Sequence, residues 1–444
     1  MKNRIKYFVA SLFVAATFTA NAQETLPINL QTVLEMGGAN NLTIKEFQAK
    51  QELATANLLK AKEWWLPNVY AGLQTHQLWG AAMNADGRFF LDVNRQNLWA
   101  GLGLNANWNI AEGIYKTKAA KLQVQASVYE TQAERNNTLL ATIKSYYDLQ
   151  TAQMKLIAYK NLVAQSDTIT KQIAIQVEAG LRYQSELLLS KSNQSHLKIE
   201  MLNAQSEYNQ KSAELVRLLN LDSKVKLVSV DSVMLPLDFQ QELLSVNDTT
   251  YKSRPEIKSI DFTIRSLQTE RKITTTGLFI PTLSIGTYGS YFGRINGVVT
   301  PMFPLQYPET KQLYPTGMLN ASLTWSIPLG RLVYGGDLQR YNSQIKIQEI
   351  KSEQFKAQIN EEIANANQLL IIGKEQIQIA KEGLKLTTEA LNQSIERQKL
   401  GTVKPFEVFQ AQQFYLQAQI DHLKAISEYN KAQFALKVAK GEIL

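Results

Sequence analysis

The residue types that most often carry catalysis and metal binding are scarce in this chain. Its 444 residues include no cysteine and only three histidines, His76, His196 and His422, which are scattered along the sequence. The lack of cysteine excludes a disulfide framework, a thiolate metal site, a cysteine nucleophile and a lipid-modified N-terminal cysteine. Histidines so far apart do not have metal-ligand spacing. We therefore expect no metal site and no cofactor.

Other chemical signatures are also missing from the sequence. The adjacent carboxylates Glu361 and Glu362 are interpreted as a solvated helix face rather than a catalytic pair. The segment Gly373-Lys374-Glu375 lacks the rest of a phosphate-binding loop. No H-E-x-x-H, G-x-S-x-G or dinucleotide-binding pattern occurs. The sequence therefore predicts that the protein is not an enzyme, so any transport would draw its energy from a partner.

The N-terminus has the three parts of an export signal. Lys2, Arg4 and Lys6 form a basic start, an apolar run follows from Phe8 to Phe18, and Ala20-Asn21-Ala22 provides a cleavage pattern. A signal peptide over 1–22 is predicted, with a short buried helix as the alternative. After it, no 18-residue apolar window occurs, which excludes a helical membrane span. The formal charge of +8 is interspersed along the chain, so no nucleic-acid partner is expected.

The rest of the chain repeats itself once. The same motifs recur in the same order, and the offset between them rises from 213 (41 to 254) to 221 (180 to 401). The paired motifs are Asn41–Lys45 with Arg254–Lys258, Leu66–Val69 with Ile280–Leu283, Trp108–Ile110 with Trp325–Ile327, and Glu178–Leu181 with Lys399–Thr402. This pattern predicts a duplication with small insertions. The first repeat covers 23–220, a linker 221–253, and the second repeat 254–444.

Each repeat contains a pair of strands with apolar residues at every second position. The pattern predicts strands at about 67–79, 97–110, 281–292 and 317–328. One interpretation is a soluble antiparallel sheet with one wet face. The other is a membrane barrel wall, with the apolar face toward lipid and the polar face toward water. The predicted lipid-facing residues are Leu98, Leu102, Leu104, Trp108, Leu319, Leu323 and Trp325.

Four strands cannot close a barrel. In hydrocarbon, an open sheet edge leaves backbone groups unpaired at a cost of several kcal/mol each. If the strands lie in a membrane, several chains must therefore share one barrel. Two chains would supply eight strands and three would supply twelve, and the pattern itself does not choose between them.

Very long helices make up most of both repeats. The segment from Ile114 to Val177 contains neither proline nor glycine, and such a helix would span roughly 100 Å. Helices are predicted at about 113–178 and 336–399, with returning helices at about 185–219 and 405–440. Their apolar spacing is roughly that of coiled coils. Gly180 and Gly401 are expected where each long helix reverses direction.

Taken together, these motifs resemble TolC-type outer membrane efflux proteins, the outer membrane factors. The resemblance covers 23–444 and depends on Leu66-Pro67 and Ile280-Pro281 before the strands, on 108–113 and 325–330 after them, and on the glycine tips. It implies a mainly α fold with a β-barrel part. Four strands per chain would share a twelve-stranded trimeric barrel in the outer membrane, continued by a helical coiled-coil barrel in the periplasm.

The resemblance also implies a function. Such proteins are passive exit ducts of tripartite efflux or type I secretion systems, working with a periplasmic adaptor and an inner-membrane pump of the RND or ABC type. The connections 80–95 and 293–316 would face outside the cell, and the linker 221–253 would lie in the belt around the helices. The alternative is a soluble periplasmic adaptor, which would have one helical hairpin and no pore.

The family's functional residues map onto the two helix-reversing turns. The turns themselves, with Gly180, Leu181, Gly401 and Thr402, would touch the adaptor, although a helix C-cap explains the glycines by itself. Glu407 matches one of two acidic gate positions, and its first-repeat equivalent is Glu186. Gln410 matches the other acidic position but carries no charge, so we expect weaker cation block.

The family's closing latch is absent from the second turn. Its tyrosine and arginine positions hold Gln398 and Val403 here. A pairing of Lys399 or Lys404 with Glu186 is one hypothesis for a substitute.

Overall fold

The computed structural model describes residues 25–83, 86–231, 233–239, 248–296 and 313–444. The predicted signal peptide and the centre of the 293–316 connection lie outside these residues. The chain forms two compact units. The helical unit comprises residues up to Ala49, Tyr129–Ile257 and Gln354–Leu444, and the sheet unit comprises Lys50–Val128 and Lys258–Glu353.

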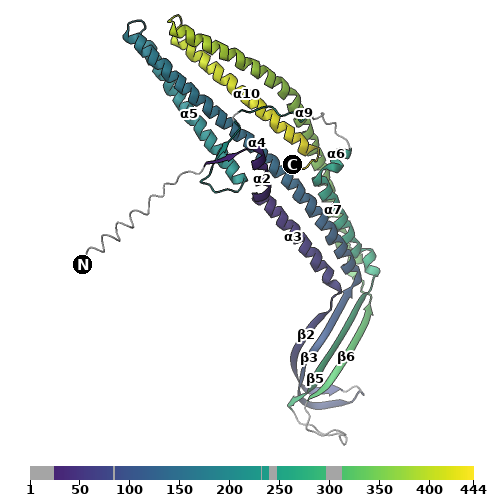
Figure 1. The fold of residues 1–444 in the computed structure, drawn as a ribbon. Helices are drawn as coiled ribbons and strands as arrows, with labels where there is room; N and C mark the ends of the chain where they lie inside the picture. The colour runs from purple at the N-terminus through teal and green to yellow at the C-terminus, as the bar shows by residue number, and fades with distance from the viewer. Residues whose placement is uncertain (1–24, 84–85, 232, 240–247, 297–312) are drawn as a thin grey trace, which may run out of the picture. The chain divides into compact units, whose positions relative to one another are not determined.

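The two repeats supply similar elements in the same order (Figure 1). The first contains β1 (Thr25–Ile28), α2 (Leu30–Asn40), α3 (Leu42–Lys62), η1 (Glu63–Trp65), β2 (Asn68–Met83), β3 (Phe89–Asn109), α4 (Ile110–Glu178) and α5 (Gln184–Leu218). The linker contains β4 (Lys226–Ser229) and α6 (Asp248–Ser253). The second contains α7 (Pro255–Arg271), η2 (Lys272–Thr274), η3 (Thr276–Phe279), β5 (Thr282–Asn296), β6 (Leu313–Thr324), α8 (Leu329–Tyr334), α9 (Gly336–Lys399) and α10 (Pro405–Ala439).

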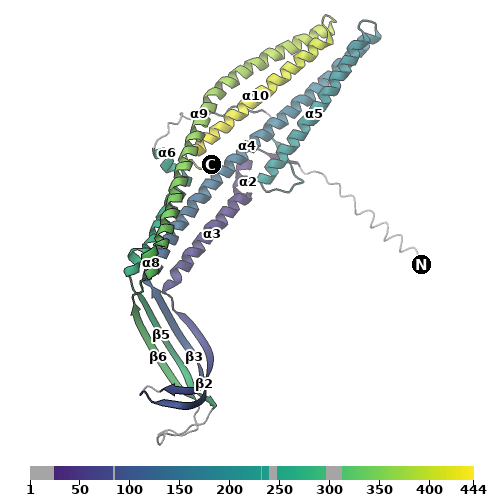
Figure 2. The ribbon, with the colours of Figure 1, turned by 180° about the vertical axis from the view of Figure 1, so that it is seen from behind.

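The sheet unit is built on one antiparallel sheet in the order β2-β3-β5-β6 (Figure 2). The register pairs Val69 with Leu104, Leu104 with Thr287, and Thr287 with Leu319. Residues directly opposite one another share a face of the sheet. One face therefore collects the apolar alternate residues of all four strands.

The strands of the first hairpin are longer than the sequence predicts. The connection 80–95 was expected as a loop, but β2 continues to Met83 and β3 begins at Phe89. The ladder reaches Met83 opposite Phe89, with an irregularity between Gly80 and Ala82. The prediction failed because the alternation of apolar and polar residues stops before the hydrogen-bonded ladder does. In the second hairpin, β6 ends at Thr324, so Trp325 follows the strand.

Side chains that donate to backbone carbonyls connect the helices of the sheet unit. The Thr117 hydroxyl of α4 donates to the Ala61 carbonyl of α3 at 2.7 Å. The Ser266 hydroxyl of α7 donates to the Ala119 carbonyl at 2.9 Å. At the end of β3, the Trp108 indole donates to the Trp65 carbonyl at 2.6 Å. These bonds join α4 to α3 and to α7, and β3 to η1.

The core of the helical unit lies among α4, α5 and α10. Its largest fully buried side chains include Ile143, Tyr146 and Leu149 of α4 and Leu215 of α5. Apolar side chains of α10 complete the cluster: Leu416, Ile420, Ile426 and Phe434. Within the described residues, no helix is long and apolar enough to cross a membrane.

The linker is more ordered than its mixed composition suggests. Its strand β4 pairs in parallel with β1, and Leu227 of β4 is buried in the core of the helical unit. The Tyr208 hydroxyl donates to the Leu227 carbonyl at 2.6 Å, and Asn430 of α10 bonds the backbone of Leu235 and Leu237. This small sheet was not predicted from the sequence, because four-residue strands have too short a pattern to recognise.

Each returning helix ends with the same backbone motif. Asn220 and Gly441 adopt positive φ angles of 51° and 81°. After α5, Leu221 N–H donates to the Val216 carbonyl, and after α10, Glu442 N–H donates to the Lys437 carbonyl. These six-to-one bonds belong to Schellman motifs, which satisfy carbonyls that a helix end leaves free.

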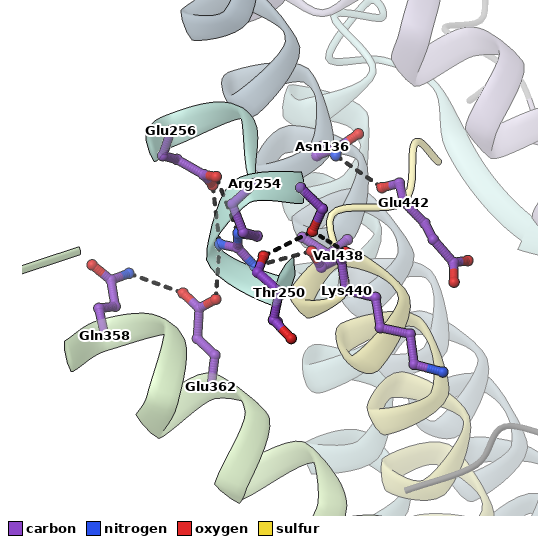
Figure 3. A network of polar contacts seen from close by, with 10 residues as sticks. Asn136, Thr250, Arg254, Glu256, Gln358, Glu362, Val438, Lys440 and Glu442 are labelled. Carbon is purple, nitrogen blue, oxygen red and sulfur yellow. Dashed lines mark hydrogen bonds and ion pairs between the residues drawn. The ribbon is translucent and has the colours of Figure 1, made fainter. Parts of the chain in front are cut away.

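The paired motifs at 41 and 254 anchor these helix ends. The Asn41 amide donates to the Leu218 carbonyl of α5 at 2.7 Å, and its oxygen accepts from Thr43 N–H at 2.8 Å as the cap of α3. In the second repeat, the Arg254 guanidinium donates to the Val438 carbonyl of α10 at 2.9 Å (Figure 3). Asn41 in the first repeat and Arg254 in the second thus both bind a backbone carbonyl at the end of a returning helix.

The Arg254 anchor is charged and almost fully buried. Its guanidinium pairs with Glu256 and with Glu362 of α9, both at 3.0 Å, and its side chain is 3% exposed (Figure 3). Nearby, the Ser253 hydroxyl donates to the Lys440 carbonyl at 2.8 Å. This network joins α7, α9 and the end of α10.

We expect Arg254→Ala to destabilise the protein by about 3–5 kcal/mol, because it leaves the nearly buried carboxylate of Glu256 without its partner and removes the donor to the Val438 carbonyl. Asn41→Ala removes neutral bonds only and should cost about 1–2 kcal/mol. Chemical denaturation in detergent, followed by circular dichroism, compares the two.

Arg265→Ala is the control, because Arg265 forms an exposed pair with Asp261 on α7 and should contribute about 0–1 kcal/mol. An Arg254→Ala loss no larger than that of Asn41→Ala would contradict the proposed difference.

Candidate functional site at the hairpin tips

The two turns that end the long helices are built alike. Gly180 and Gly401 have φ angles of 77° and 74°, which a residue with a β-carbon rarely adopts. Leu181 N–H donates to the Gln176 carbonyl at 2.8 Å, and Thr402 N–H donates to the Arg397 carbonyl at 3.0 Å. Both turns are therefore Schellman motifs. The glycines are required by backbone geometry whatever else the turns do.

An apolar cluster joins the two tips. Ile169 and Ile173 of α4 and Leu187 of α5 pack with Val408 and Phe409 of α10. Val403, in the second turn, belongs to the same cluster and is buried. Burial of apolar side chains stabilises such a contact in proportion to the area removed from water. The two hairpins thus share one small core at their ends.

Arg182 crosses between the tips inside this arrangement. It extends from the first turn and donates to the carbonyls of Val403, at 3.0 Å, and Gln398, at 3.4 Å, in the second turn. It also bonds Gln176 at 2.7 Å and pairs with Glu186 at 3.0 Å. The Arg182 side chain is only 8% exposed. A buried guanidinium stabilises a contact most when its N–H groups are hydrogen-bonded, because the bonds offset the cost of removing the charge from water.

The hypothesis that a lysine pairs with Glu186 is wrong for this chain. Glu186 pairs with Arg182, whereas Lys399 pairs with Glu396 at 2.6 Å. Lys404 is the residue before α10 and lies on the surface. The arginine is preferred physically because its planar donors reach a carboxylate and two carbonyls at once.

Gln398 occupies an unusual place at the second tip. Its side chain is fully buried, and within the described residues neither its amide nitrogen nor its amide oxygen has a hydrogen-bond partner. A buried polar group without a partner costs about 1–3 kcal/mol. The backbone of the same residue accepts from Arg182. Gln398 therefore contributes its backbone carbonyl to the contact between the tips, while its side-chain amide forms no hydrogen bond within the described residues.

The two predicted gate residues on α10 point away from this core. Glu407 and Gln410 are both exposed, in contrast to their buried neighbours Val408 and Phe409. Glu407 lies in the first helical turn, where the helix dipole favours a negative charge. Within one chain, Glu407 is free to face another subunit or solvent. The structure thus brings Glu186, Gln398 and Val403 together around Arg182 and leaves Glu407 and Gln410 outside.

Arg182 was not predicted from the sequence, although a signal for it exists. Aligning the tips on Gly180 and Gly401 places Arg182 at the position of Val403. The first repeat thus carries an arginine two residues after its tip glycine, where the second repeat carries a valine.

The predicted lipid-facing residues share one face of the sheet. Leu102, Leu104, Leu319 and Leu323 are exposed on it, and the register adds Leu98. Trp108 is half-buried where its indole bonds η1, and Trp325 is exposed just after β6.

The described residues hold no cluster of three or more histidine, cysteine or acidic side chains that could bind a metal ion. Burial lowers the pKa of His422 on α10, and Lys381 adds to this effect.

Comparison with known proteins identifies the fold. Residues 33–221 match the family described as outer membrane efflux protein. Among solved structures, the Campylobacter jejuni CmeC outer membrane channel aligns over 93% of this chain and 85% of its own, with a TM-score of 0.78 and 16% identity. The outer membrane protein VceC of Vibrio cholerae aligns over 93% and 96%, with a TM-score of 0.71 and 14% identity. No protein with a curated description matches the sequence.

A third structure, the open state of the Neisseria gonorrhoeae MtrE outer membrane channel, aligns over 93% of this chain and 89% of its own, with a TM-score of 0.70 and 14% identity. The predicted resemblance is therefore confirmed, and so is a mainly α fold with a four-stranded antiparallel sheet in each chain. The alternative of a soluble adaptor is not supported, because the chain folds into two helical hairpins and a four-stranded sheet.

We expect Arg182→Ala to loosen the contact between the tips, because it removes two charged hydrogen bonds to the second turn. At about 1.5–3 kcal/mol for such bonds, backbone amides of residues 398–404 should exchange with solvent roughly 10- to 100-fold faster, measured by hydrogen exchange and mass spectrometry.

Arg397→Ala serves as the control, since Arg397 is an exposed arginine at the end of α9. Unchanged exchange in Arg182→Ala, or an equal increase in Arg397→Ala, would show that the cross-tip bonds do not hold the turns.

Proposed function

We propose that this chain is a member of the outer membrane efflux protein family and the passive outer-membrane exit duct of a tripartite efflux or type I secretion system. Its sheet lies in the outer membrane as part of a closed barrel, and its long helices continue the conduit into the periplasm. It conducts solutes or polypeptides that an inner-membrane pump delivers with the help of a periplasmic adaptor.

The exposed apolar face of the sheet is the observation that carries this proposal. Leu73, Leu102 and Leu319 are 64–79% exposed on it. The band from Leu98 to Trp108 covers about 33 Å along the strand at roughly 3.3 Å per residue. With the strand tilt of membrane barrels, this gives a height of about 25 Å, which matches their apolar band. Soluble monomeric proteins rarely expose so large a continuous apolar surface to water.

The two open edges of the sheet require other copies of the chain. Among the described strands, β2 and β6 each pair on one side only. Pairing β6 of one copy with β2 of the next satisfies both edges in a head-to-tail ring. The exposed apolar side chains of α8, next to the β6 edge, would be covered by the same contact: Leu329, Leu332, Val333 and Tyr334.

Three copies fit a duct better than two. In an eight-stranded barrel the interior is just filled by side chains. The face opposite the apolar band carries Tyr70, Trp99 and Tyr288, which would fill so narrow a barrel. Twelve strands leave room for a passage, so a homotrimer is proposed.

The partners follow from the missing energy source and from the tips. The sequence has no phosphate-binding loop, so a pump of the RND or ABC type supplies the energy. The turns at Gly180 and Gly401, with Leu181 and Thr402 exposed beside them, are the proposed docking surface for the adaptor. The end of the first hairpin, with Met83 of β2 and Phe89 of β3, faces the cell exterior.

A pair of introduced cysteines tests the duct and its ring together. The natural chain has no cysteine, so background cross-linking is absent. Ala71→Cys on β2 combined with Leu319→Cys on β6 should give covalent trimers in the outer-membrane fraction with a flexible thiol cross-linker. The purified protein should conduct ions in planar bilayers.

Either cysteine alone should give at most dimers. A protein that carbonate releases from membranes and that gives no conductance would refute the duct, and a covalent dimer in the double variant would refute the trimer.

At the periplasmic end, Glu407 would form one ring of three carboxylates. Rings of acidic side chains hold cations and disfavour anions. Glu407→Gln should therefore weaken block of the bilayer current by hexaamminecobalt(III) by about tenfold or more. Gln410→Glu, one helical turn further on, should add a second ring and strengthen the block.

Glu389→Gln is a matched control, because Glu389 is an exposed acid on α9 away from the turn. A block that is unchanged by Glu407→Gln would remove Glu407 from the conduit.

A further inference from the structure

The face of the sheet opposite the apolar band is not uniformly polar. The register places Gly72, Gly101 and Ser290 in one row across three strands. On one side of this row lies Trp99, and on the other lie Tyr70 and Tyr288, paired with Gly103. Small residues thus form a floor between aromatic side chains.

From the burial of its side chains we infer that this aromatic face is the concave side of the sheet. Side chains on a concave face converge and shield one another, whereas those on a convex face diverge. Trp99 and Tyr288 are half-buried and Ser290 is buried. On the opposite face, Leu73, Leu102 and Leu319 are 64–79% exposed. In a closed barrel, the aromatic face therefore lines the lumen.

Two of the rings lie over a glycine of the neighbouring strand. A β-carbon on Gly103 would come within 2.3 Å of the Tyr70 ring, so the ring lies across that glycine. The Trp99 ring would be 3.7 Å from a β-carbon on Gly72. The Trp99 and Tyr288 rings meet edge to face, with centroids 5.7 Å apart. Glycine at these positions lets the rings lie along the wall, and Tyr70 keeps 40% of its surface exposed.

Ser290 provides a polar group among these rings. Its side chain is 7% exposed, and within the described part of the chain its hydroxyl has no hydrogen-bond partner. A β-carbon on Gly101 would come within 2.5 Å of the Ser290 β-carbon, so only glycine fits beside it. An unpaired hydroxyl next to aromatic rings can donate to a polar substituent of a bound molecule.

We propose that Tyr70, Trp99, Tyr288 and Ser290 form a binding site on the lumen wall for planar aromatic solutes in transit. The rings stack on the solute, and the Ser290 hydroxyl donates to an anionic or polar substituent. The inference rests on the proposed duct, in which each trimer carries three such sites at one height. It assigns the barrel wall a preference of its own, in addition to any selection by the pump.

Stacking on an aromatic side chain strengthens binding of a planar ring by about tenfold or more. A planar and a flexible probe of the same charge isolate this contribution. Pyrene-1-sulfonate and octane-1-sulfonate both carry one sulfonate, so electrostatic attraction to the pore is the same for both. Pyrene-1-sulfonate should block the bilayer current at about tenfold lower concentration than octane-1-sulfonate.

Trp99→Leu and Tyr288→Leu keep apolar bulk but remove a ring. Each should reduce the roughly tenfold difference between the two probes by about two- to threefold, and Ser290→Ala should weaken the pyrene-1-sulfonate block several-fold. The matched control is Tyr291→Leu, because Tyr291 follows Ser290 on β5 but is 59% exposed on the opposite face. Both probes should block the current through Tyr291→Leu at the same concentrations as for the natural protein.

Equal block by both probes, or an equal loss in Tyr291→Leu, would overturn the site. Current without any probe reports the duct separately, so a conducting but non-discriminating pore refutes only the aromatic site. If no variant conducts, the proposed duct fails. Fluorescence titration of pyrene-1-sulfonate onto the protein in lipid nanodiscs, with Tyr291→Leu as reference, then still decides whether the rings bind it.

Discussion

Unpaired backbone at the two edges of one sheet is the constraint on which the rest of this protein depends. Four strands expose a continuous apolar face, yet β2 and β6 each have a neighbour on one side only. In hydrocarbon each unpaired backbone group costs several kcal/mol, so the edges must meet other edges. Assembly is therefore a condition for a stable membrane wall. Only in such a closed ring would the glycine and aromatic residues of the concave face line a lumen.

In the helical unit the main constraint is that the last carbonyls of each returning helix need hydrogen-bond donors. Both returning helices finish in Schellman motifs and are then held by a side chain from the start of a repeat. Asn41 provides a neutral anchor, whereas Arg254 is surrounded by Glu256 and Glu362. In both repeats a side chain donates to a carbonyl at the end of the returning helix, but only in the second repeat is that side chain charged. The anchor of the second helix end is consequently also linked to α9 through Glu362, whereas Asn41 holds the first helix end through a neutral bond.

At the hairpin tips, packing and charge act together. The apolar cluster around Val408 brings the turns into contact, and Arg182 then satisfies carbonyls of the opposite turn. Without the cluster, the arginine would exchange these bonds for water at little cost. Because both hairpins of one chain are joined here, any widening of the conduit at this end must first separate the Arg182 contacts or move the two hairpins together.

The sequence by itself determined the duplication, the alternating strands and the long helices. Glycine, proline and apolar spacing act locally, so Gly180, Gly401 and the leucines of β3 are readable without coordinates. It also indicated the family, because short motifs recur in a fixed order. Only the tertiary structure decided the partners of Glu186 and Arg254, the β1–β4 pair and the full length of β2 and β3. Those features depend on residues distant in the chain, and a hydrogen bond between remote segments leaves no periodic trace in either one.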